Sequence, residues 1–161
     1  EAFCNTRDEK LLRQILPSFD QETKDFFRWQ VAYDQEELGK ILLMKSGIDF
    51  GLVQDLIPLE RGPSGRIVRL KIVGTKTSVV VGKELEIRRW LSRTHLYSSA
   101  FVVEAQRDPS GQDCRFVLHG GGWGHGVGLC QIGAAVMASQ GIPAEAILRH
   151  YFRGASLKKL Y

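Results

Sequence analysis

The stretch HGGGWGHGVGLCQIGAA, from His119 to Ala135, holds seven glycines in seventeen residues. Glycine in an ordered backbone costs about 0.5–1 kcal/mol relative to alanine, because glycine loses the most conformational freedom on folding. A folded chain keeps so many glycines together for one of two reasons. Either the backbone must adopt positive φ angles, which other residues avoid, or another group must approach the backbone closely. Whatever the chain folds into must accommodate this stretch.

Four of these glycines recur at every second position: Gly122, Gly124, Gly126 and Gly128. If the segment is extended, the four share one bare face, and Trp123, His125 and Val127 point the other way. A bare backbone face beside an indole and an imidazole suits a flat, hydroxyl-rich ligand such as a sugar chain. Trp123, His125 and Gly126 are therefore candidate glycan-binding residues. The alternative is that the glycines form tight turns in a packed junction and that Trp123 belongs to the core.

The glycine spacing does not match a nucleotide-binding loop. Gly128 and Gly133 are spaced as in a phosphate-binding loop, but Ala134 occupies the lysine position, and no G-x-G-x-x-G pattern occurs. A helix is predicted to begin at Gln131. The free N–H groups at a helix start can hold an oxygen-rich group, and the Gln131 side chain adds a donor and an acceptor. Gln131 is a further candidate binding residue, and a simple local helix cap is its alternative role.

Hydrophobic periodicity and turn residues predict the remaining elements. The expected helices are Asp8–Leu16, Asp34–Gly47, Glu84–Leu91, Gln131–Gly141 and Pro143–Phe152. The expected strands are Asp25–Tyr33, Arg66–Val73, Thr77–Gly82, Ala100–Gln106 and Cys114–Gly120, with a turn over Arg107–Asp113. Helices and strands do not alternate regularly, so the predicted class is α+β, with mainly antiparallel strands, short helices and a C-terminal helix pair after the glycine-rich loop. Arg66, Arg69 and Lys71 predict one basic face on the second strand.

The length of 161 residues suits a single domain, 1–161, of ordinary globular composition, with 43% hydrophobic and 25% charged residues. The net charge of +4 and the pI of about 9.1 favour acidic partners only mildly, and no nucleic-acid partner is predicted. No apolar run approaches the ~18 residues of a transmembrane segment. Cys4, Cys114 and Cys130 have no C-x-x-C spacing, which leaves either one disulfide and a thiol or three thiols. Cys114 is expected to be buried in its strand.

The segment GWGHGVGLCQIGAAVMASQGIPAEAILRHYF, Gly122–Phe152, resembles the C-terminal motif of the SpoIID/LytB domain family, G-x-G-H-G-V-G-[ML]-S-Q followed by G-A, M-A and I-L-x-H-Y-[YF]. Weaker similarity extends upstream through SGR at Ser64–Arg66, ELEIRRWL and SSAFVV. EAF at the first residues resembles the end of the family's S-G-G-x-[ST]-E stretch. By this resemblance the chain is the C-terminal portion of a larger SpoIID/LytB-like domain.

The resemblance implies a function in the bacterial cell wall, outside the cytoplasm. Family members act on peptidoglycan, either as lytic transglycosylases that leave a 1,6-anhydro end or, in the LytB branch, as enhancers of wall amidases. The expected partners are therefore peptidoglycan glycan strands and, in the second case, an amidase. A lytic transglycosylase needs one carboxylic acid, which the family carries upstream of the position matching residue 1. Glu1 is not that residue, and neither Glu60, Glu84 nor Glu104 is assigned the role, so the chain by itself is predicted to be inactive.

Two cysteines occupy positions of interest within this resemblance. Some family members bind zinc through His and Cys near the position of Cys4, which makes Cys4 a possible remnant of a zinc site, although no cofactor is predicted overall. Cys130 stands where the family usually has Ser, and a nucleophilic Cys130–His125 pair is a less favoured alternative. His119 and His150 are expected to be hydrogen-bonded structural residues.

Overall fold

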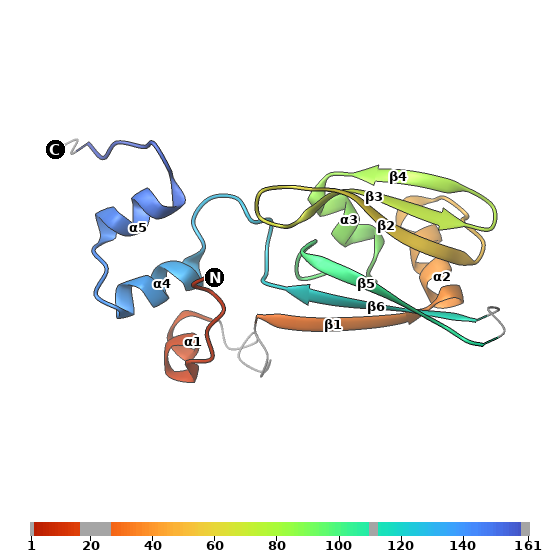
Figure 1. Cartoon of the computed structure of the whole chain (residues 1–161), viewed down its shortest axis with the longest axis horizontal. Helices are drawn as coiled ribbons and strands as arrows, with labels where there is room; N and C mark the ends of the chain where they lie inside the picture. The colour runs from red at the N-terminus through yellow and green to blue at the C-terminus, as the bar shows by residue number, and fades with distance from the viewer. Residues whose placement is uncertain (1, 17–26, 110–112, 159–161) are drawn as a thin grey trace. The chain divides into compact units, whose positions relative to one another are not determined.

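The computed structural model describes residues 2–16, 27–109 and 113–158. In that part of the chain, five helices and six strands follow one another in the order α1 (Glu9–Ile15), β1 (Arg28–Asp34), α2 (Gln35–Ser46), β2 (Val53–Arg61), β3 (Ile67–Gly74), β4 (Ser78–Gly82), α3 (Glu84–Trp90), β5 (Phe101–Arg107), β6 (Cys114–Gly121), α4 (Gln131–Ser139) and α5 (Ala144–Tyr151). They form two compact units (Figure 1). One unit comprises Arg28–His125, and the other comprises Glu1–Phe27 with Gly126–Tyr161.

The unit Arg28–His125 contains two antiparallel sheets of three strands each, ordered β1-β6-β5 and β2-β3-β4. In the first sheet β6 is central, and its register pairs Trp29 with Gly120 on one side and Phe101 with Gly120 on the other. In the second sheet β3 is central between β2 and β4. The mixed class, the antiparallel pairing and the C-terminal helix pair were all predicted and are confirmed.

One hydrophobic core unites the two sheets with α2 and α3. Each sheet buries one face, the two helices add the fully buried Leu38, Leu42 and Ile87, and Leu91, which directly follows α3, is also fully buried. Cys114 belongs to this core, as expected, and burial raises the pKa of its thiol. The core fixes the end of β6, from which the glycine-rich segment leaves.

The close contact between β1 and β6 depends on Gly120. A Cβ atom on Gly120 would overlap the indole ring of Trp29, which is the residue of β1 that pairs with Gly120. The absence of a side chain at Gly120 therefore lets a large aromatic residue pack flat against the backbone.

Local sequence signals explain most helix boundaries. The Asp34 carboxylate accepts the Glu37 N–H at 2.6 Å at the start of α2, and Gly47 ends the helix with a φ of 74°. Asp8 caps α1 in the same way, as predicted. Pro17 and the start of the predicted strand at Asp25 lie outside the described residues, as does the centre of the turn predicted over Arg107–Asp113.

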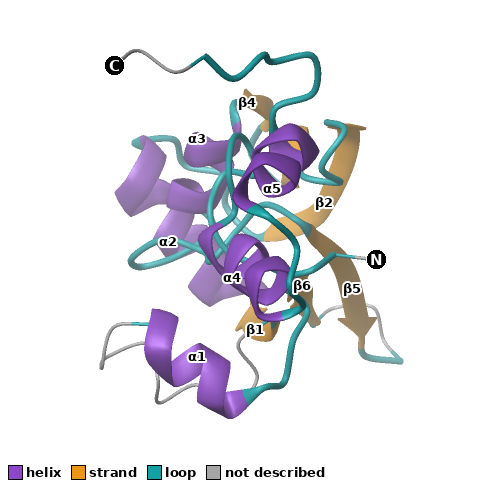
Figure 2. Cartoon of the chain, turned by 90° about the vertical axis from the view of Figure 1, so that its left-hand side faces the viewer, coloured by secondary structure: helices purple, strands orange, loops and turns teal. Residues whose placement is uncertain are grey.

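The helical unit is built around α4, which contacts both α1 and α5 (Figures 1 and 2). Ile132, Val136 and Met137 of α4 and Ile147 of α5 are buried. Gly133 allows the hydroxyl of Tyr151 to rest against the α4 backbone, where a Cβ atom would collide with it. The close contact between Gly133 and Tyr151 thus contributes to the packing of α5 against α4.

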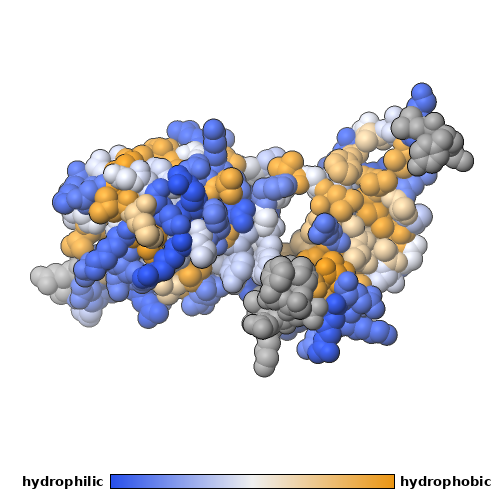
Figure 3. Space-filling model, turned by 180° about the vertical axis from the view of Figure 1, so that it is seen from behind, coloured by the Kyte–Doolittle hydropathy of each residue, from blue (hydrophilic) through white to orange (hydrophobic). Residues whose placement is uncertain are grey.

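The outer surfaces differ between the two units. Figure 3 shows hydrophobic residues gathered on the helical unit, whereas the same face of the two-sheet unit is mainly hydrophilic. On the β2-β3-β4 sheet, Arg69 is exposed and Lys71 half-buried, in agreement with the predicted basic face. Arg66 departs from that prediction, because it precedes β3 and its side chain hydrogen-bonds elsewhere, as described below. None of the helices in the described ranges has the length and apolar character that crossing a bilayer requires.

Strand β2 was not among the predicted strands. Its sequence VQDLIPLER contains a proline and four polar or charged residues, and its pairing with β3 shifts register at three places. Irregular pairing of this kind disrupts the alternation by which a strand is recognised.

Candidate functional site

The glycine-rich segment is not extended. Gly122, Gly124, Gly126 and Gly128 have φ angles of 71°, 74°, 74° and 76°. These angles lie in the left-handed region that residues with side chains rarely adopt. The prediction of an extended segment, in which the four glycines would form one bare face, is therefore wrong. The prediction that the backbone needs positive φ angles at these glycines is confirmed. At Gly124 and Gly128 no atom lies within 4 Å of an added Cβ, so backbone conformation rather than crowding requires glycine there.

Internal hydrogen bonds hold the first half of this segment. The Trp29 indole N–H donates to the carbonyl of Gly122 at 3.1 Å. The Arg66 guanidinium donates to two consecutive carbonyls, from Nη2 to Trp123 at 3.0 Å and from Nε to Gly124 at 2.8 Å. The Gly124 N–H donates to the carbonyl of Tyr97 at 2.8 Å. These backbone groups already have partners in the protein, so the expectation that they are open to a ligand fails for this half.

The loop Leu96–Phe101 is the main support of the segment. Each of its residues makes a hydrogen bond to another part of the same unit. Arg88 Nε donates to the carbonyl of Leu96 at 2.7 Å, the Gly124 N–H donates to the carbonyl of Tyr97, and Ser98 Oγ donates to the carbonyl of Gly121 at 3.1 Å. The carbonyl of Ser99 accepts the Ile67 N–H at 3.0 Å, the carbonyl of Ala100 accepts the Gly121 N–H at 2.9 Å, and the carbonyl of Phe101 accepts a hydrogen bond from Arg61 Nη2 at 2.8 Å. The loop therefore locks the end of β6 to both sheets.

Two aromatic side chains stack at this place. The rings of Tyr97 and Trp123 have centroids 4.8 Å apart and planes only 18° from parallel. Tyr97 is 41% exposed, whereas Trp123 is half-buried and packs against the core. The buried ring of Trp29 lies 5.8 Å from Tyr97. Trp123 thus packs partly against the core, as the alternative role predicted, and stacks on the partly exposed ring of Tyr97, while its role in glycan binding stays a prediction.

The remaining predicted binding residues lie farther along the chain. His125 is exposed and ends the two-sheet unit, while Gly126 begins the helical unit. Gln131 is the exposed first residue of α4. It does not cap that helix: the cap is Cys130, whose Sγ accepts the Gly133 N–H at 3.4 Å. The structure brings Trp123 together with Tyr97 and Arg66 in the two-sheet unit, whereas Gly126 and Gln131 belong to the helical unit.

The histidines and carboxylates that were not assigned a catalytic or binding role have ordinary partners. His119 Nε2 lies 2.8 Å from Glu104 Oε2, and hydrogen bonds from Gln106 and then from His119 lower the pKa of Glu104. Glu60 is exposed and lies 3.7 Å from Arg69. The Glu84 side chain is only 14% exposed and pairs with Arg88 at 3.5 Å. Its exposure is low because the first turn of α3 packs against β3 and β4.

The possible zinc ligand Cys4 lies in the helical unit, near α4 and α5. His150 makes edge contacts there with Phe3 and Tyr151, at centroid distances of 5.3 and 4.8 Å. Within the described ranges no three His, Cys, Asp or Glu side chains come together as a metal site requires.

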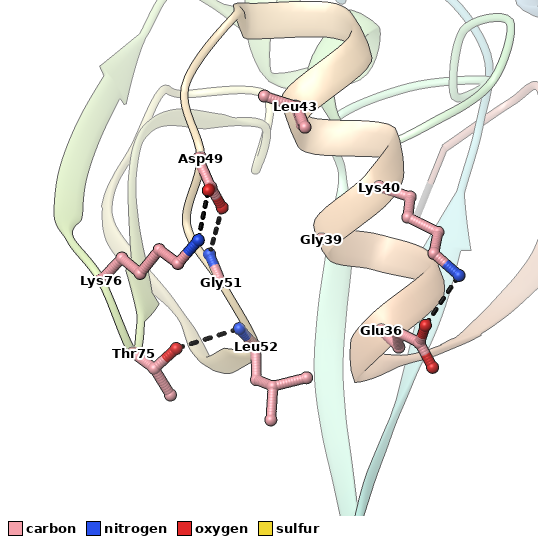
Figure 4. Close-up of a pocket in the computed structure, with 9 residues that line it drawn as sticks. All are labelled: Glu36, Gly39, Lys40, Leu43, Asp49, Gly51, Leu52, Thr75 and Lys76. Atoms are coloured by element: carbon pink, nitrogen blue, oxygen red, sulfur yellow. Dashed lines mark hydrogen bonds and ion pairs between the residues drawn. The ribbon is translucent and has the colours of Figure 1, made fainter.

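A shallow pocket of about 350 Å³ opens between α2 and the loops that follow it (Figure 4). Leu43 and Leu52 supply apolar walls, and Asp49 pairs with Lys76 at one side. Hydrogen bonds from Lys76 and from the Gly51 N–H lower the pKa of Asp49. None of the residues predicted from the sequence to bind a ligand lines this pocket.

The sequence analysis did not identify Tyr97 as the partner of Trp123 or Arg66 as a hydrogen-bond donor to the glycine-rich segment. Tyr97 lies 26 positions before Trp123, in a loop without regular periodicity, so no local pattern connects the two. Arg66 was identified as part of a basic strand face and as the end of the SGR segment, without a structural role for its side chain. The SGR and SSAFVV segments were the available signals, because Arg66 ends the first and the second follows Tyr97 immediately.

Comparison with known proteins gives two matches. The chain is 34% identical over 83 residues to stage II sporulation protein D of Bacillus amyloliquefaciens, a match that covers 52% of this chain and only 22% of that protein. The relation is therefore distant and partial. A family model described as a domain of unknown function, DUF8618, matches residues 1–128, which include the aromatic pair, Arg66 and His125 but neither α4 nor α5. Since this match covers well over half of its length, the chain belongs to the DUF8618 family.

Proposed function

We propose that the chain binds peptidoglycan glycan strands as part of a lytic transglycosylase related to stage II sporulation protein D. The observation that carries this proposal is the stacked Tyr97–Trp123 pair at the end of β6. In this proposal Trp123, His125, Gly126 and Gln131 contribute to the glycan site, and Tyr97 joins them. The proposed location is outside the cytoplasm, where the wall polymer is found.

An aromatic surface of this kind suits a sugar. The axial C–H groups of a pyranose ring present an apolar face, which packs against an aromatic plane, while its hydroxyls need hydrogen-bonding groups around the rim. Tyr97 offers exposed ring surface and a hydroxyl, and exposed His125 lies two residues beyond Trp123. Because the surrounding backbone is held by Arg66 and the Leu96–Phe101 loop, the surface is ordered before a ligand arrives.

Three carboxylates of the chain, those of Asp49, Glu86 and Glu104, do not suit the general acid of a transglycosylase. A general acid must be protonated before it gives its proton to the glycosidic oxygen, and burial usually raises the pKa of such a group. For Asp49, Glu86 and Glu104, hydrogen bonds lower the pKa instead. The proposal therefore assigns the acid to a glutamate outside these 161 residues, in sequence preceding residue 1.

The same observation supports a second candidate function. A module that binds glycan without an acid of its own would serve as a non-catalytic wall-binding domain or as an enhancer of a wall amidase. This alternative uses the same aromatic surface, so it differs from the first only in catalysis.

Binding is tested by titrating purified glycan strands against the wild-type chain and Trp123→Ala. Loss of stacking and of associated hydrogen bonds is expected to cost about 1–3 kcal/mol, which weakens affinity ~5- to 150-fold. Trp90→Phe is the matched control, since Trp90 lies on α3 and hydrogen-bonds Glu86. Circular dichroism verifies that each variant is folded. Equal affinities for wild type and a folded Trp123→Ala protein would remove Trp123 from the site.

Catalysis is tested by digesting glycan strands and searching for 1,6-anhydro ends by mass spectrometry. The 161-residue chain alone is expected to give none, and the complete protein is expected to give them unless its upstream glutamate is changed to glutamine. Anhydro products from the chain alone would overturn the assignment of the acid. A complete protein that binds but does not cleave would favour the wall-binding or enhancer function.

A further inference from the structure

The N-terminal turn and the start of α4 meet in the helical unit. The Asn5 N–H donates to the Ala2 carbonyl at 2.9 Å, which places Phe3 and Cys4 at the centre of a turn. The Phe3 ring meets His150 of α5 edge-on. A Cβ atom on Gly133 would lie 3.5 Å from the Phe3 Cβ. The turn that carries Cys4 is therefore seated on the first turn of α4.

Cys130 also contacts Gly133. Its Sγ accepts the N–H of Gly133, the residue against which Phe3 and the Tyr151 hydroxyl also rest. Gly133 is thus the common neighbour of the Cys4 turn, Cys130 and Tyr151. Burial raises the pKa of the Tyr151 phenol, and the charges of Cys130 and Cys4 raise it further. The charges of both cysteines therefore act on the same phenol.

We infer that Cys4 and Cys130 form a disulfide bond that fastens the N-terminal turn to α4. Both side chains are half-buried and belong to one compact unit, whereas the third thiol, Cys114, is buried in a strand of the other unit. Two cysteines can be bridged when their Cα atoms are about 4.4–6.8 Å apart. Phe3, the neighbour of Cys4, and Cys130 both contact Gly133, so the segments that carry the two cysteines meet there from opposite ends of the sequence.

The oxidant is a small-molecule disulfide such as oxidised glutathione. One cysteine thiolate attacks a glutathione sulfur, which forms a mixed disulfide and releases one glutathione thiolate. The second cysteine loses its proton and attacks the protein sulfur of the mixed disulfide, which releases the second glutathione. The pair of cysteines loses two electrons and two protons, and one oxidised glutathione becomes two reduced molecules.

The test uses the whole 161-residue chain equilibrated with oxidised glutathione. Remaining thiols are alkylated, and the protein is digested without reduction and analysed by mass spectrometry. The expected product is a cross-linked peptide pair containing Cys4 and Cys130, with Cys114 recovered as an alkylated thiol. Separate glutathione adducts on Cys4 and Cys130 at equilibrium, or a cross-link that includes Cys114, would overturn the inference.

Single variants distinguish the bond from a general effect of oxidation. Cys4→Ser and Cys130→Ser each remove one sulfur and keep a side chain of similar size, and a serine at position 130 retains the ability to cap α4. A disulfide across nearly the whole chain restricts the unfolded state, so oxidation is expected to raise the guanidinium midpoint of the wild type and of neither variant. An oxidised wild type with the same midpoint as its reduced form contradicts the proposed bond, even if a variant folds poorly.

Discussion

Gly124→Ala isolates the cost of the left-handed backbone in the glycine-rich segment. Gly124 has a φ of 74°, and no atom lies within 4 Å of the position that a Cβ would take. The substitution therefore introduces conformational strain without a collision. A residue with a side chain in this region costs roughly 1–2 kcal/mol relative to right-handed backbone.

Part of that cost is offset in the unfolded state. Replacing glycine reduces the freedom of the unfolded chain, which contributes about 0.4–1 kcal/mol in the opposite direction. The expected net loss is about 1 kcal/mol in the free energy of unfolding. For a chain of this length that corresponds to a decrease of roughly 2–4 °C in melting temperature.

The matched control is Gly62→Ala. Gly62 has no positive φ, and its added Cβ would make an ordinary contact with Val68 at 3.5 Å. This control should melt at or slightly above the wild-type temperature. Differential scanning calorimetry and guanidinium titration on both variants provide the comparison. If Gly124→Ala is as stable as Gly62→Ala, residue 124 does not need left-handed backbone and the account of the segment is wrong.

Three other substitutions test neighbouring contacts. Gly120→Ala should destabilise the two-sheet unit by about 1–3 kcal/mol and change Trp29 fluorescence, since the new methyl group overlaps the indole; an unchanged midpoint and spectrum would contradict the packing. Arg66→Ala should cost about 2 kcal/mol in a guanidinium titration, because two carbonyls lose a charged donor, and Arg66→Lys should recover only part; full recovery with lysine would argue against the paired hydrogen bonds. Glu104→Gln should melt at a lower temperature than the wild type at neutral pH. The difference in melting temperature should close as pH falls below 4.5, because a carboxyl group with a lowered pKa in the folded state stabilises the fold only while it is ionised. A difference that widens in acid would refute this pH dependence.

The elements that sequence predicted well carry their signals locally. Asp34 and Gly47 bracket α2 within a dozen residues, and the alternating apolar residues of β3 and β4 flank a short turn. Their conformations are decided mainly by neighbours in sequence, so a local pattern is sufficient. Strand β2 is decided instead by its long-range pairing with β3, which tolerates Pro58 and shifts of register.

The candidate site shows the same division between local and distant causes. The positive φ of the glycines follows from residue type alone, but alternate glycines are equally compatible with an extended strand and with a series of turns. What selects between them is the Arg66 guanidinium, the Tyr97 carbonyl and the Trp29 indole, all far away in sequence. The contribution of Tyr97 therefore could be found only in three dimensions.

The Leu96–Phe101 loop limits what can be moved from this protein into another. A peptide or graft that carries only His119–Gln131 would contain Gly122, Gly124, Gly126 and Gly128 but none of the distant hydrogen-bond partners that fix the shape of this segment. A transplanted motif would need the loop, Arg66 and Trp29 with it. For the same reason, another sequence that shares the glycines alone has only the potential for this shape, whereas one that also shares the loop and Arg66 has the partners that fix it.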